Sequence, residues 1–101
     1  MHFILAFHVP PDKSLDQREL EIVKLFGGEQ GRFDSFQPIA YRHLVGDHAW
    51  EHPPYAYVDH EDRWYENGPV LPGWSHDWGK AVLLMTTGAS DSIIVYADCH
   101  R

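Results

Sequence analysis

The residues of this chain that are best suited to chemistry are its eight histidines. His48 and His52 have the spacing that places two imidazoles on one face of a helix, and Glu51 lies between them. Imidazole and carboxylate are ligand types that zinc accepts in proteins. These three residues define one alternative for the function, a small metal-dependent or histidine-dependent enzyme with zinc as its cofactor.

The surrounding sequence speaks against that alternative. Pro53 restricts the residue before it, His52, to dihedral angles outside the helical region. The chain contains no G-x-S-x-G nucleophile turn, no H-E-x-x-H zinc motif and no phosphate-binding glycine loop. The sequence therefore favours a protein that is not an enzyme and has no catalytic residues, no metal and no cofactor.

A second group of residues combines aromatic rings with negative charge. Residues 44–79 contain all four tryptophans, three tyrosines and seven acids, and Arg63 is their single basic residue. Their formal charge is 1 − 7 = −6, out of −7 for the whole chain. Aromatic side chains provide contact area at low entropic cost, and carboxylates attract Lys and Arg on a partner. The predicted partner-binding site consists of Asp59, Glu61, Asp62, Trp64, Tyr65 and Glu66.

These features predict a small acidic protein-binding domain that acts as an inhibitor. Immunity proteins that block nuclease toxins, and phage anti-defence proteins of the anti-CRISPR kind, cover basic nucleic-acid-binding surfaces in this way. Carboxylates would stand where phosphates normally bind, so the protein would be a nucleic-acid mimic. The expected partner is a basic protein, either a nuclease or a nucleic-acid-binding complex. A net charge of −7 opposes direct binding to nucleic acid or to an anionic membrane. A dimeric small-molecule-binding α+β domain is the other alternative.

Length and composition predict one folded domain that spans residues 1–101. With 44% hydrophobic residues, the chain can form a core without crosslinks. Cys99 is the single cysteine, so no disulfide can form within the chain, and we expect the thiol to be solvated or half-buried and to have no reactive role. No apolar segment approaches the ~20 residues that span a bilayer, and no signal peptide is recognisable. The expected location is the cytoplasm.

Periodicity predicts the elements that position these residues. Residues 2–9 alternate as a strand with apolar side chains on both faces. Residues 14–26 form an amphipathic helix, with Ser14 as N-cap and with Gly27 expected to end it in a left-handed conformation. Further strands are expected at residues 39–44, 55–59, 63–65, 81–87 and 92–97, the last two joined as a hairpin.

This order of elements predicts an α+β fold. It consists of one antiparallel sheet of about four to six strands, with a single main helix, residues 14–26, packed on one face.

Overall fold

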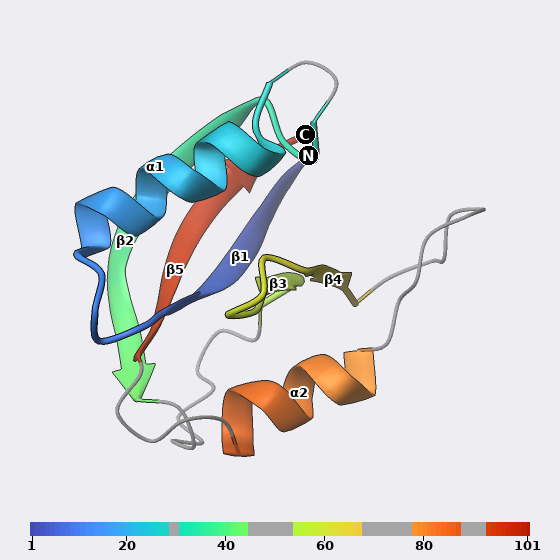
Figure 1. Ribbon diagram of the computed structural model, residues 1–101. Helices are drawn as coiled ribbons and strands as arrows, with labels where there is room; N and C mark the ends of the chain where they lie inside the picture. The colour runs from blue at the N-terminus through green and yellow to red at the C-terminus, as the bar shows by residue number, and fades with distance from the viewer. Residues whose placement is uncertain (29–30, 45–53, 68–77, 88–92) are drawn as a thin grey trace.

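The computed structural model describes residues 1–28, 31–44, 54–67, 78–87 and 93–101, with side chains at all of these except 40–44 and 86–87. Five strands form one sheet in the order β2-β5-β1-β3-β4 (Figure 1). The α+β class with a single sheet is therefore confirmed. The elements are β1 (His2–Val9), α1 (Leu15–Phe26), β2 (Ser35–Leu44), β3 (Ala56–Val58), β4 (Trp64–Glu66), α2 (Trp78–Thr87) and β5 (Ile93–His100).

The sheet is mixed, whereas the sequence predicted antiparallel strands throughout. β5 runs antiparallel to both of its neighbours, β1 and β2, and β3 and β4 form an antiparallel hairpin. β1 and β3, however, are parallel, with Leu5 opposite Ala56 and Phe7 opposite Val58. β3 has only three residues, and a segment this short does not encode the direction in which its strand runs. The parallel pairing of β1 with β3 could therefore not be predicted from the local sequence.

Each face of the sheet has its own hydrophobic cluster. Alternate residues of β1, including Leu5 and Phe7, pack with Ile22 of α1. The second cluster contains Ala6 of β1 together with Ala81 and Met85 of α2. Because successive side chains of a strand point to opposite faces, the two helices contribute to opposite faces of the sheet.

Helix α1 begins as the sequence predicted, with the Ser14 hydroxyl accepting a hydrogen bond from the backbone N–H of Gln17 at 3.1 Å. Its end differs in detail. Gly27 is extended, with φ −86°, and the left-handed residue is Gly28, with φ 105°. Gly27 is needed for a different reason, because a Cβ there would lie 2.6 Å from the carbonyl oxygen of Val23.

Residues 81–87 belong to helix α2, so the predicted strand and its hairpin with the last strand are wrong. A short run that is apolar on all sides fits a strand or a buried helix equally well. Alanine, leucine and methionine favour the helix, and Trp78, Ala81 and Met85 then fall on its buried side. The chain thus has a second helix. No helix among the described residues is long and apolar enough to span a membrane.

Candidate protein-binding surface

The hairpin of β3 and β4 gathers the six predicted partner-binding residues but turns half of them into the protein. Asp59 and Glu66 are each 2% exposed, and Tyr65 is 6% exposed. Of the four carboxylates in this set, the two that face solvent belong to Glu61 and Asp62. The predicted residues therefore do not form one continuous anionic patch.

Asp59 holds the turn between the two strands together. Its Oδ1 accepts hydrogen bonds from the backbone N–H groups of Glu61, at 2.8 Å, and Arg63, at 3.0 Å. Its Oδ2 accepts a hydrogen bond from the Tyr65 hydroxyl at 2.9 Å. The turn also needs a left-handed residue, Asp62, with φ 63°, a conformation that aspartate adopts more readily than most residues. The Asp59 carboxylate is thus an internal acceptor.

Replacing Tyr65 with phenylalanine is expected to lower the free energy of unfolding by about 1–2 kcal/mol, because the buried Asp59 carboxylate loses a donor. Burial and the hydrogen bond to Asp59 raise the pKa of Tyr65 to about 12, so the hydroxyl keeps its proton at neutral pH. Urea unfolding of both proteins measures the difference. Tyr55→Phe, at a half-buried position, is the control and should change stability by less than about 0.5 kcal/mol. Equal losses in the two variants would contradict this role.

The side chains of Trp64 and Glu66 also make contacts within the protein. The indole of Trp64 packs against Phe26 of α1, with ring centroids 5.1 Å apart, and donates a hydrogen bond from Nε1 to Glu66 Oε1 at 3.1 Å. The Arg101 guanidinium forms an ion pair with the same carboxylate. Glu66 is therefore neutralised within the molecule, and Trp64 joins the hairpin to α1.

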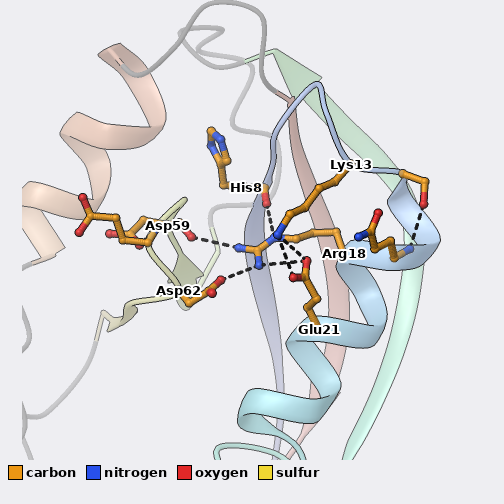
Figure 2. A network of polar contacts seen from close by, with 9 residues as sticks. His8, Lys13, Arg18, Glu21, Asp59 and Asp62 are labelled. Carbon is orange, nitrogen blue, oxygen red and sulfur yellow. Dashed lines mark hydrogen bonds and ion pairs between the residues drawn. The ribbon is translucent and has the colours of Figure 1, made fainter.

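A buried arginine connects α1 to this hairpin (Figure 2). Arg18 is 2% exposed and donates hydrogen bonds to the carbonyl oxygens of His8, at 2.7 Å, and Asp59, at 3.0 Å. It also forms an ion pair with Asp62 at 2.6 Å. Glu21 lies 3.8 Å from Arg18 and is bound by Lys13 at 2.8 Å. The Asp62 carboxylate is therefore engaged within the protein.

The remaining acids divide into paired and unpaired groups. Asp98 pairs with His2 at 3.1 Å, Asp34 with His100 at 3.0 Å, and Glu61 with Arg63 at 3.2 Å. Within the part of the chain that the structure describes, and apart from Asp59, whose carboxylate accepts internal hydrogen bonds, the acids without an ion pair are Asp12, Asp16 and Glu19. Two of these three lie on α1, outside the segment that the sequence singled out.

A groove runs between α1 and the edge strand β2, and we call it the α1–β2 groove. Two of its residues are large apolar side chains that face solvent, since Leu20 is 72% exposed and Val23 is 42% exposed. The groove therefore combines an apolar surface with unpaired negative charge. It is lined by Asp16, Glu19, Leu20 and Val23 of α1 and by Phe36 and Pro38 of β2.

The carboxylates of Asp16 and Glu19 in this groove have no ion-pair partner among the described residues. Partial burial, and secondly the negative charge of Asp16, raise the pKa of Glu19 above its ordinary value. Both causes disfavour the carboxylate form, and a cation placed between the two side chains would offset them by favouring it. Groups on a partner that could supply this cation are the ammonium of lysine and the guanidinium of arginine.

The described part of the chain contains no candidate site for the metal of the enzyme alternative. His48, Glu51 and His52 lie outside the described residues. Within the described ranges, no group of three or more His, Cys, Asp or Glu side chains is placed to hold a metal ion. Cys99 is fully buried in β5, whereas the sequence predicted a solvated or half-buried thiol. Burial raises the pKa of this thiol to about 12, which disfavours the nucleophilic thiolate at neutral pH.

No protein-family model, no curated protein sequence and no solved structure matches this chain.

Proposed function

We propose that this protein is a small acidic protein-binding domain that binds a basic partner protein through the α1–β2 groove. One observation carries the proposal: the unpaired carboxylates of Asp16 and Glu19 lie beside the exposed side chains of Leu20 and Val23 on one groove. Binding would remove the apolar surface from water and supply the missing positive charge.

We place the contact on α1 and β2 instead of on residues 59–66 because the carboxylates of the hairpin have partners within the protein. Asp59, Asp62 and Glu66 are each bound by internal donors. The net charge of −7 would still attract a basic protein from a distance and raise its association rate. A nuclease or another nucleic-acid-binding protein that docks its basic surface here would be inhibited sterically.

The proposal predicts that affinity depends on salt through the two groove carboxylates. We suggest two peptides of about 16 residues with equal leucine content, one with four lysines and one with four glutamates. Fluorescence anisotropy should show tighter binding of the lysine peptide, and weaker binding as NaCl rises from about 50 to 500 mM. The double variant Asp16→Asn, Glu19→Gln should weaken binding about two- to tenfold at low salt and flatten the salt dependence.

The matched control removes the same amount of charge elsewhere. Asp34 and Glu61 have side chains that are 53% and 54% exposed, and both lie outside the groove. The double variant Asp34→Asn, Glu61→Gln should bind the lysine peptide with nearly unchanged affinity. Equal weakening in the two double variants would mean that net charge alone attracts the peptide, and the groove would not be the contact.

A further inference from the structure

We infer that the occupant of the α1–β2 groove is an amphipathic helix that packs antiparallel to α1. Its apolar residues lie over Leu20 and Val23, and the lysines or arginines that follow them lie over Glu19 and Asp16. This inference rests on the proposed function and specifies the kind of partner that the groove binds.

The spacing of the groove residues on α1 favours a helical occupant. Residues 16, 19, 20 and 23 follow the i, i+3, i+4, i+7 pattern, so they form one stripe along the helix. Side chains from such a stripe form the ridges and grooves into which a second helix packs. The buried stripe of α1, which contains Arg18 and Ile22, lies on a different side. The outward stripe therefore offers a helix-packing surface that no described element covers.

The neighbouring strand is a poor template for a sixth strand. β2 lies at the edge of the sheet, but Pro38 in the groove has no N–H group to donate to an added strand. The pairing register of β2 also shifts between Pro38 and Arg42, and such an irregularity disrupts an edge for further pairing. An extended peptide could not form a regular backbone ladder here, so side-chain packing has to hold the occupant.

Electrostatics set the direction of the bound helix. Along α1 the acids come first, at 16 and 19, and the apolar residues follow, at 20 and 23. An antiparallel partner therefore places its basic residues toward its own C-terminus, where the helix dipole favours positive charge. A parallel partner would need the same charges near its N-terminus, where the dipole disfavours them.

The occupant belongs to another protein. A second copy of this chain also carries a net charge of −7, so its approach to the acidic groove is unfavourable. The segments 29–30, 45–53, 68–77 and 88–92 contain no lysine or arginine, so none of them can supply an ammonium or guanidinium group to Asp16 and Glu19. A basic amphipathic helix from a different chain satisfies both requirements.

Three peptides of about 16 residues and identical charge test this inference. The forward peptide has two leucines four residues apart, followed by two lysines four residues apart. The reversed peptide has the lysines first, and the third has the forward order with a central proline. All are acetylated and amidated, and each is titrated by fluorescence anisotropy into the wild-type protein and the Leu20→Asp variant.

We expect the forward peptide to bind about two- to fivefold more tightly than the reversed one, and to gain helical circular dichroism on binding. The proline peptide should bind more than about tenfold more weakly. If the proline peptide binds as tightly as the forward peptide, and both depend on Leu20, the helical occupant is wrong while the proposed function stands. Tighter binding of the reversed peptide would overturn the antiparallel orientation. If no lysine peptide shows binding that depends on Leu20, the proposed function fails as well.

Discussion

Replacing Arg18 with methionine is expected to lower the free energy of unfolding by about 3–5 kcal/mol. The methionine retains an apolar side chain in the buried stripe of α1 but removes every donor. The Asp62 carboxylate loses its ion pair, and the carbonyl oxygens of His8 and Asp59 lose hydrogen bonds in a site where Arg18 is 2% exposed. The cost is a large fraction of the stability of a typical small domain, about 5–15 kcal/mol. Chemical denaturation followed by tryptophan fluorescence measures it directly.

Arg63 provides the matched control for this variant. It forms an ion pair with Glu61 at 3.2 Å, but its side chain is 60% exposed. Arg63→Met should therefore change the free energy of unfolding by less than about 1 kcal/mol, as expected for a solvent-exposed pair. If the two variants lose the same stability, the buried guanidinium does not connect α1 to the hairpin as the contacts indicate.

Replacing Leu20 with aspartate is expected to weaken binding of the forward peptide by at least about 30-fold. Burying a leucine contributes about 1.5–3 kcal/mol, and the substitution also adds a charge that would lose its water on binding. A loss of 2 kcal/mol already corresponds to about 30-fold in the dissociation constant. The free protein should fold normally, because Leu20 is 72% exposed. Isothermal titration calorimetry gives the affinity, and circular dichroism verifies the fold.

Leu25 is the control for Leu20, since it is also an exposed leucine of α1 but does not line the groove. Leu25→Asp changes charge and hydrophobicity by the same amount on the same helix, and it should retain nearly all of the affinity. The same two variants can be used to capture the natural partner, which should bind the Leu25 variant and be lost with the Leu20 variant. Loss of peptide binding in both variants would exclude a contact restricted to the groove.

Helix α1 was predictable because several local signals agree on it. Ser14 supplies a side-chain cap, and residues 15, 22 and 26 form an apolar stripe that ends at a glycine. The position of Arg18 could also have been read from this pattern, because it falls in the same stripe between Leu15 and Ile22. What the sequence could not provide was its set of partners, which come from β1 and from the β3–β4 turn.

The burial of Asp59 and Glu66 was not predicted, because a count of charges does not distinguish exposed from internal carboxylates. Asp59 stands immediately before a tight turn, where an aspartate often accepts hydrogen bonds from backbone N–H groups. Glu66 is internal only because Arg101, at the far end of the chain, pairs with it. The first of these features has a local signal, and the second depends on tertiary structure.

The α1–β2 groove could not be predicted from the sequence, for a different reason. The sequence alone showed that Leu20 and Val23 are apolar, but it could not show that a helix would leave them exposed. The groove exists because β2 lies at the edge of the sheet, beyond β5, and brings Phe36 and Pro38 beside α1. Strand order is a property of the whole fold, so it has no signature in either segment.

The most direct test of the binding surface is a titration of ¹⁵N-labelled protein with the forward peptide, followed by amide chemical shifts. We predict that the largest changes fall on residues 16–23 of α1 and on Phe36 of β2, with little change at residues 60–64. Changes confined to residues 60–64, with α1 unaffected, would show that the partner binds the hairpin and would contradict the assignment of the α1–β2 groove as the contact surface.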